Sequence, residues 1–186
     1  ENEEPHKKGS VERRKFIQKT EKIKSILFLG DFVPNSNFTF DAALEEYLKT
    51  QDIVLCNLEG AFTKNRLKAV KAGSTLSLNE KYFTRYSQFF DIAALANNHS
   101  MDFGTDGLLE TINILKMNKV ISIGSGKNIN EALLPFELDN ILIFNIAEHE
   151  FGGADKNKPG IATSDFEELL INLIREGKRN GKIVII

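Results

Sequence analysis

The chain has 186 residues, of which 41% are hydrophobic and 27% are charged, and this composition suits one globular domain with a substantial core. The formal net charge is -2, so the charge balance argues against nucleic acid as a main partner. The single cysteine, Cys56, excludes an internal disulfide framework and fits a reducing compartment. Because Cys56 lies in an apolar segment, we expect it to be a small buried residue.

Residues 1–24 form the first predicted unit, a charged N-terminal extension with eight Lys or Arg and five Glu residues. Its apolar residues are too sparse for a strong amphipathic stripe, so we expect a solvated leader, with contact to a membrane surface or a partner as the alternative. The chain has no run of about 20 apolar residues that would span a membrane, and no apolar core of a signal peptide is visible. We expect a cytoplasmic location for the chain as it stands, and a membrane-associated or extracytoplasmic one if an N-terminal anchor has been removed.

Apolar segments alternate with segments of helical periodicity in the rest of the chain. Strands are predicted at residues 25–29, 52–58, 91–96, 120–123, 141–146 and 182–186. Helices are predicted at residues 40–49, 79–89, 105–117, 129–134 and 165–176. The strands are apolar on both faces, which is typical of buried strands in a layered α/β fold. The pattern predicts one domain at residues 25–186, with a mixed, mostly parallel sheet flanked by helices.

The last predicted strand, Lys-Ile-Val-Ile-Ile at residues 182–186, has the composition of a core strand. A core strand at the end of a chain exposes apolar surface and unpaired backbone groups. We therefore expect this domain to be the N-terminal portion of a larger one, truncated at its C-terminus.

Three consecutive main strands are each followed by residues that can bind a metal ion. Asp31 follows the first strand, Glu59 follows the second, and Asn98 and His99 follow the third. A single acidic residue in a turn is common and has little meaning alone. Parallel neighbouring strands would bring all four side chains to one edge of the sheet, where open α/β folds place their ligands.

The chemistry of phosphoester hydrolysis explains why these residue types would meet. Two divalent ions about 3.5–4 Å apart need a bridging carboxylate, terminal carboxylate and amide oxygens, and imidazoles. Such ions activate a water molecule and neutralise the phosphoryl oxygens. Mn, Zn and Fe all suit a mixed set of this kind, so the sequence leaves the metal open.

Three segments together resemble a known family. They are Gly30-Asp31, Asn57-Leu58-Glu59-Gly60, and Ala-Leu-Ala-Asn-Asn-His-Ser-Met-Asp-Phe-Gly at residues 94–104. This combination resembles the CapA/PgsA-type capsule (poly-γ-glutamate) biosynthesis proteins, which have a calcineurin-like metallophosphoesterase fold. The resemblance extends over residues 25–186. It implies a role in making or exporting a capsule polymer, with an anionic polymer or a phosphoester as substrate and other capsule-synthesis proteins as partners.

The same resemblance implies roles for individual residues. Asp31 matches the first metal-ligand motif and is expected to be both ligand and catalytic residue. Glu59 matches the bridging acid, and Asn98 matches the amide ligand. His99 matches the motif histidine that assists the leaving group or orients phosphate, and we include it among the metal ligands.

The match departs from general metallophosphoesterases in two respects. The position two residues after Asp31 usually holds a histidine but is Val33 here, a departure that the capsule family shares. The later histidines are also absent, since the chain contains only His6, His99 and His149. We therefore do not expect a complete two-metal centre from this chain alone. A phosphoesterase, a non-catalytic component of a polymer synthesis or export complex, and an inactive truncated relic remain as alternatives.

Other polar residues near these motifs are weaker candidates. Asp102 would either orient His99 or cap the following helix, and the neighbouring Gly104 and Gly107 favour a cap or turn role. Glu148 and His149, with Glu150, follow a predicted strand and are candidate ligands or substrate contacts, with a solvated turn as the alternative.

Two loops offer groups that could bind phosphate or an anionic polymer. The glycine-rich turn at residues 123–128 could cradle phosphate with backbone N–H groups, but a strand-to-helix connection with Asn128 near a helix cap is favoured. The basic loop at residues 61–73 is predicted to be solvated rather than bound to an anion. Its cationic residues are Lys64, Arg66, Lys68 and Lys71.

Overall fold

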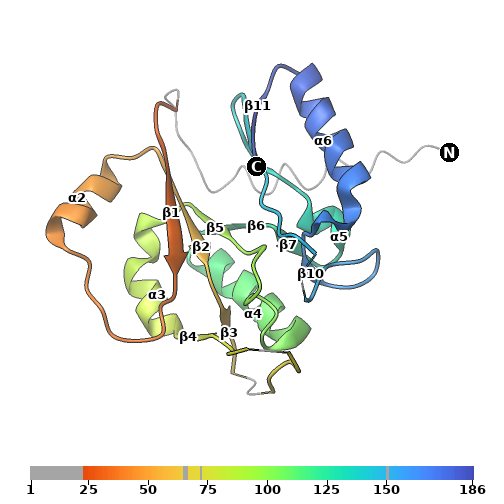
Figure 1. Cartoon of the computed structure of the whole chain (residues 1–186). Helices are drawn as coiled ribbons and strands as arrows, with labels where there is room; N and C mark the ends of the chain where they lie inside the picture. Colours follow the sequence, from red (N-terminus) through yellow and green to blue (C-terminus); the bar gives the residue numbers. More distant parts are fainter. Residues whose placement is uncertain (1–22, 65–66, 72, 150) are drawn as a thin grey trace.

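The computed structural model describes residues 23–64, 67–71, 73–149 and 151–186 (Figure 1). Most of the predicted N-terminal extension, including His6, lies outside the described residues, as do Arg66 and Glu150. In the part of the chain that the structure describes, no helix is both long enough and apolar enough to cross a membrane.

A four-stranded parallel sheet forms the centre of the molecule, in the order β1-β2-β5-β6. Its strands are β1 (Ile26–Phe32), β2 (Ile53–Leu58), β5 (Ile92–Ala94) and β6 (Ile121–Ile123). Each neighbouring pair is parallel, so the carboxyl ends of all four strands lie at one edge. The predicted α/β fold with a mostly parallel sheet is confirmed.

Helices cover one face of this sheet: α2 (Ala42–Lys49), α3 (Glu80–Tyr86) and α4 (Gly104–Met117). Val54, Cys56 and Leu58 alternate along β2 and point into the core on this side. Rings from β1, from the loop after it and from residues 86–90 pack on one another there; they are Phe32, Phe38, Phe40, Tyr86, Phe89 and Phe90. Cys56 is buried, as predicted, and this burial raises the pKa of its thiol to about 12.

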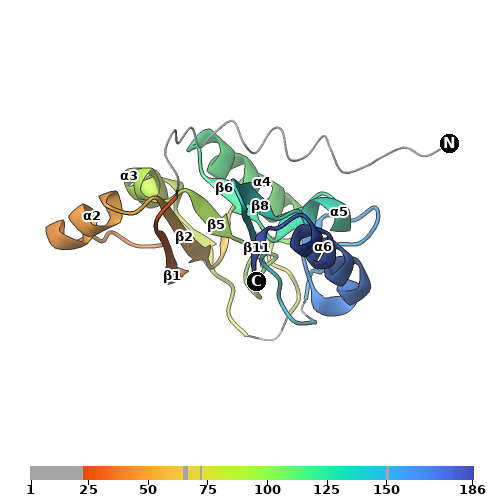
Figure 2. The same ribbon diagram turned by 90° about the horizontal axis from the view of Figure 1, so that it is seen from above.

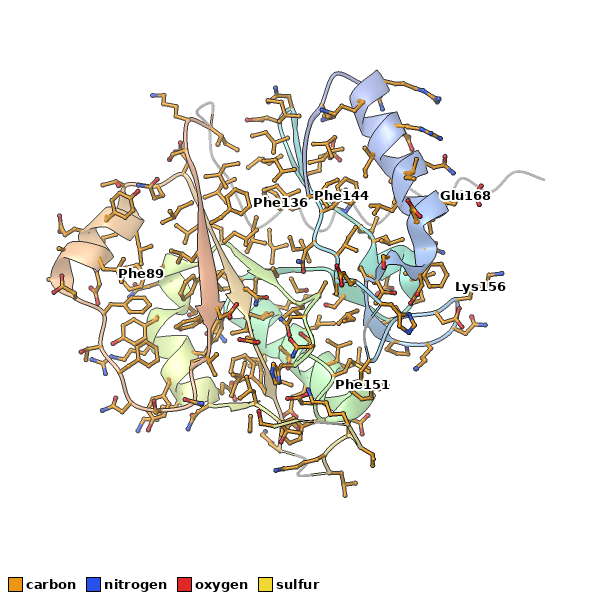
Figure 3. All side chains as sticks on the ribbon, viewed as in Figure 1. Phe89, Phe136, Phe144, Phe151, Lys156 and Glu168 are labelled. Atoms are coloured by element: carbon orange, nitrogen blue, oxygen red, sulfur yellow. The ribbon has the colours of Figure 1, made fainter. Side chains whose placement is uncertain are left out.

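A smaller mixed sheet covers the opposite face, in the order β11-β9-β8. Its strands are β8 (Phe136–Leu138), β9 (Ile141–Ile143) and β11 (Ile183–Ile185). Ile53 and Leu55 of β2 share a core with Phe136 and Ile143 of this sheet, and Figure 3 shows Phe136 between the central strands and α6. Each β2 face is therefore buried, which explains why β2 has no alternation of apolar and polar residues.

Helix α6 (Glu167–Arg179) packs on the outer side of the smaller sheet. Gly177 of α6 lies so close to Leu142 that a Cβ atom at this position would stand 2.6 Å from Leu142 Cδ1. The layers thus run helix, sheet, sheet, helix, with α3 and α4 on one side and α6 on the other (Figure 2). Strand β11, predicted as a core strand, is only partly buried at one edge of the smaller sheet.

Several short elements differ from the sequence prediction. The predicted basic loop begins with β3 (Ala61–Phe62), which pairs with β4 (Ser77–Leu78). Strands β7 (Ser125–Gly126) and β10 (Gly160–Ile161) also pair, and β8 was not predicted. Strands of two or three residues are too short to show a period, so the sequence carried no signal for them. The remaining elements are α5 (Ile129–Ala132) and two 3₁₀ turns, η1 (Ser87–Phe89) and η2 (Ser164–Phe166).

Candidate functional site

The carboxyl ends of β1, β2 and β5 bring the candidate residues to one edge of the central sheet. Asp31 lies within β1, because this strand continues two residues beyond Gly30. Glu59 follows β2, and its backbone N–H donates to the carbonyl of Phe32 at 3.2 Å. His99 lies in the turn after β5. A Cβ atom at Gly60, which has a φ of 131°, would stand 2.9 Å from a backbone oxygen, so the turn after Glu59 requires glycine.

Asp31 and Glu59 form a pair of neighbouring carboxyl groups. Burial raises the pKa of Glu59, and the charge of Asp31 and a side-chain hydrogen bond with Asp31 raise it further. The nearby His99 acts in the opposite direction. Two carboxylates that share one place cannot both ionise without cost unless a cation lies beside them. The pair is therefore an arrangement that a cation would stabilise.

The imidazole of His99 lies near this pair, and its other side contacts the buried carboxylate of Asp102. Its Nδ1 atom lies 2.8 Å from Oδ2 of Asp102, and its Nε2 atom lies 3.7 Å from Oε1 of Glu59. A carboxylate only accepts hydrogen bonds, so Nδ1 donates to Asp102. In a neutral ring, Nε2 then carries the lone pair. The distance from Nε2 to Glu59 exceeds that of a hydrogen bond.

Asp102 lies in the turn before α4 and contacts His99, but it does not cap that helix, so only the cap part of the favoured prediction was wrong. The residue before α4 is Phe103, and no side chain caps this helix end. Asp102 is fully buried, and its Oδ2 also accepts the backbone N–H of Leu76 at 2.6 Å. The carboxyl group of Asp102 thus contacts His99 and Leu76 and not the first turn of α4.

Two asparagines that the sequence analysis did not single out connect the three strand ends. Asn57 donates to Oδ1 of Asp31 at 2.7 Å, and Asn97 donates to Oδ1 of Asn57 at 3.0 Å. The Oδ1 atom of Asn97 accepts the backbone N–H groups of His99 and Ser100, each at 3.0 Å. Asn57 is the one amide in an otherwise apolar strand, and this was a signal that the sequence offered. The chain of amides fixes Asp31 relative to the His99 turn.

Asn98 occupies the same turn, but its side chain is exposed. Its backbone carbonyl accepts a hydrogen bond from Nζ of Lys71 at 2.8 Å. Within the described ranges, no three or more His, Cys, Asp and Glu side chains converge as ligands for one metal ion. The edge does bring the two carboxyl groups and Nε2 of His99 near one another, but not close enough together to form the ligand set of one metal ion.

The weaker candidate His149 pairs with a carboxylate other than Asp31 and Glu59. Nδ1 of His149 lies 2.7 Å from Oδ1 of Asp165, and the His149 side chain is 85% exposed. Hydrogen bonds from His149 and Thr163 lower the pKa of Asp165. His149 and Asp165 line a shallow pocket of about 330 Å³ beside η2. Glu148 is exposed.

The predictions for the glycine-rich turn and the basic loop have different outcomes. Asn128 accepts the backbone N–H of Glu131 at 3.0 Å and caps α5, as the connection interpretation of the glycine-rich turn expects. In the basic loop, Lys64 and Lys68 are exposed as predicted. Lys71 is not solvated: its side chain is 10% exposed and forms an ion pair with Asp102.

Comparison with known proteins places the chain in a family. The family model described as bacterial capsule synthesis protein PGA_cap matches residues 14–185. The chain therefore belongs to the PGA_cap family of bacterial capsule synthesis proteins, which confirms the resemblance to capsule proteins. A curated relative is the PGA biosynthesis protein CapA of Bacillus subtilis (strain 168), 26% identical over 152 residues. The match covers 77% of this chain and 40% of CapA, so the chain spans less than half of that relative's length.

Proposed function

We propose that the edge formed by Asp31, Glu59 and His99 is part of a divalent-metal site that serves phosphoester hydrolysis in capsule polymer synthesis. The observation that carries this proposal is the pair of carboxyl groups, in which Asp31 raises the pKa of Glu59. Nε2 of His99, which carries the lone pair when the ring is neutral, lies 3.7 Å from Oε1 of Glu59 in this pair. Carboxylates and imidazole are the donors that Mn, Zn and Fe accept together.

The chemistry of the donor set fits such an ion. Asp31, Glu59, Asn98 and His99 would hold it, with Asn98 contributing an amide oxygen. A bound ion of this kind lowers the pKa of a water molecule and neutralises charge on phosphoryl oxygens. The substrate that we propose is a phosphoester or a phosphorylated form of the anionic polymer, handed over by other capsule-synthesis proteins.

The residues of the chain itself prepare the site. Asn57 and Asn97 hold Asp31 and the His99 turn in register through their amide groups. Asp102 keeps the proton of a neutral imidazole on Nδ1. Nε2 of His99 is then the atom that can accept a proton from the substrate or bind one of its groups.

Binding of Mn²⁺ to the purified chain tests the proposal. Calorimetric titration should show binding that Asp31→Asn weakens by about 100-fold or more, since loss of a mere outer-shell partner costs about 10–100-fold. Asp106→Asn is the matched control, because Asp106 is an exposed aspartate in the first turn of α4. Equal Mn²⁺ affinity in wild type and Asp31→Asn would contradict the site.

Hydrolysis of bis(p-nitrophenyl) phosphate in the presence of Mn²⁺ separates the enzyme from the alternative. Turnover that Asp31→Asn abolishes and Asp106→Asn retains supports phosphoester hydrolysis. Mn²⁺ binding with no turnover of phosphodiesters or phosphomonoesters would favour a non-catalytic component of a polymer synthesis or export complex.

A further inference from the structure

Residues 67–71 and 73–76 pack against the candidate site, where they contact Asp102. The backbone N–H of Ala69 donates to the carbonyl of Asp102 at 2.8 Å, and the N–H of Leu76 donates to Oδ2 of Asp102. Between these two anchors, Nζ of Lys71 forms an ion pair with Oδ1 of Asp102 and donates to the carbonyl of Asn98. The ammonium group of Lys71 is thus largely buried beside the His99 ring and Asp102.

We propose that Lys71 is a positioning residue for His99. Lys71 compensates the buried charge of Asp102 and ties down the turn that carries Asn98 and His99, so that Nε2 of the ring stays directed at Glu59. The expected effect of Lys71 on metal binding rests on the proposed function. Its expected effect on the orientation of the His99 ring does not.

The energetics of the ion pair favour a positioning role over a purely stabilising one. The Lys71 side chain is 10% exposed and that of Asp102 is 0% exposed, so both charges have lost most of their hydration. Burying such a pair costs about as much as the attraction returns, and apolar residues of similar volume are often as stable. The pair therefore needs another explanation than stability, and its contact with the imidazole supplies one.

Asp102 depends on Lys71 because its two oxygens have divided roles. Oδ2 accepts from Nδ1 of His99 and from the backbone N–H of Leu76. Oδ1 accepts no hydrogen bond of good geometry from the described residues, so the Lys71 ammonium is the group that compensates it. Without this cation, a carboxylate in the interior has one oxygen with no compensating charge.

The contacts of Nδ1 decide which tautomer the ring adopts. Nζ of Lys71 lies 3.5 Å from Nδ1, and Oδ2 of Asp102 lies 2.8 Å from it. An ammonium can only donate and would require a bare Nδ1, whereas the carboxylate requires a protonated one. The shorter, charge-assisted contact prevails, so the ring carries its proton on Nδ1. Lys71 acts on the ring through Asp102 and the Asn98 carbonyl.

Long-range ¹H–¹⁵N correlation spectra of the imidazole rings in the full chain test this inference. The His99 signals are assigned with His99→Gln, and spectra are recorded at a pH where the ring is neutral. Wild type should show one tautomer with the proton on Nδ1. Lys71→Met should show averaged ¹⁵N shifts of two tautomers, while Lys71→Arg, which keeps the cation, and Lys68→Met, an exposed lysine of the same segment, should retain the wild-type pattern.

Mn²⁺ titration gives the second readout. Lys71→Met should weaken Mn²⁺ binding by about 10–100-fold, as expected for loss of an outer-shell partner, and Lys68→Met should leave it unchanged. A folded Lys71→Met protein with the wild-type His99 tautomer would overturn the inference. If wild type binds no Mn²⁺ yet Lys71→Met loses the single tautomer, the inference holds and the proposed function fails. Lys71→Gln replaces Lys71→Met, with the same expectations, if circular dichroism shows that Lys71→Met does not fold.

Discussion

When no cation is bound, ionisation of the Glu59 carboxyl group lowers the free energy of unfolding. Its pKa is raised in the folded chain by burial and by Asp31. A carboxyl group with a raised pKa holds its proton longer in the folded state than in the unfolded state. The free energy of unfolding therefore falls as pH rises above about 4.5, the ordinary pKa of this group, until the folded group has ionised.

Glu59→Gln is expected to remove this pH-dependent loss. In EDTA, the variant should gain stability over wild type as the pH rises from 4 to 7, because glutamine has no proton to lose. Urea unfolding of both proteins across this range measures the difference, and the comparison cancels groups that titrate equally in both. A difference that does not change with pH would show that Glu59 ionises as easily in the folded as in the unfolded chain.

At the scale of elements, α4 is joined to the short strand β3 by a buried hydroxyl group. Thr111 is 1% exposed; its Oγ1 accepts the backbone N–H of Phe62 at 2.9 Å and donates to the carbonyl of Gly107 at 2.8 Å. Strand β3 follows Glu59 by two residues, so this contact also fixes the chain just beyond the site.

Thr111→Val should lower the free energy of unfolding by about 1–3 kcal/mol, because the buried N–H of Phe62 loses its partner. Chemical denaturation measures the change. Thr84→Val, an exposed threonine of α3, is the matched control and should stay within about 0.5 kcal/mol of wild type. A Thr111→Val protein as stable as the control would show that the N–H finds another acceptor.

The elements that the sequence predicted well are those with enough residues to show a period. Strand β2 and helix α4 agree with their predictions because each spans several apolar positions on a buried face. Strands β3 and β7 have two residues each and are defined by their pairing with β4 and β10. No local sequence pattern reveals such pairing. Strand β1 extends past Gly30 because pairing with β2 continues through Asp31.

The same distinction applies to the site. The approach of Asp31, Glu59 and His99 followed from parallel strands with residues at their ends, although their roles stay predictions. The burial of Lys71 depends on the contacts of residues 67–71 and 73–76 with Asp102, a tertiary feature with no local signal in the sequence. For this reason a lysine in a basic segment was assigned to solvent.

At the scale of the whole molecule, Asn145 joins the smaller sheet to the central one. Its Oδ1 accepts the backbone N–H of Ala96 at 2.7 Å, immediately before the turn that carries His99. The fit requires glycine at position 124, where φ is 78° and a Cβ atom would stand 2.1 Å from this oxygen. One amide thus connects β9's loop, the glycine-rich turn and the end of β5.

Asn145→Ala should lower the free energy of unfolding by about 1–3 kcal/mol, because the N–H of Ala96 is left without its acceptor. Asn113→Ala, an exposed position on α4, should not be destabilising, since alanine favours helices. Guanidinium unfolding of the two variants gives the comparison. Equal stability of Asn145→Ala and wild type would mean that the two sheets hold together without this bond.

The parallel order of the central sheet has a consequence for how the molecule folds. The hydrogen bonds from Asn57 to Asp31 and from Asn97 to Asn57 join residues 26 and 40 positions apart, so each waits for a helical crossover to close. Contacts of such long range form slowly and late. We therefore expect the candidate site to form late in folding, and a ligand that needs all three strand ends to slow unfolding while leaving the rate of folding nearly unchanged.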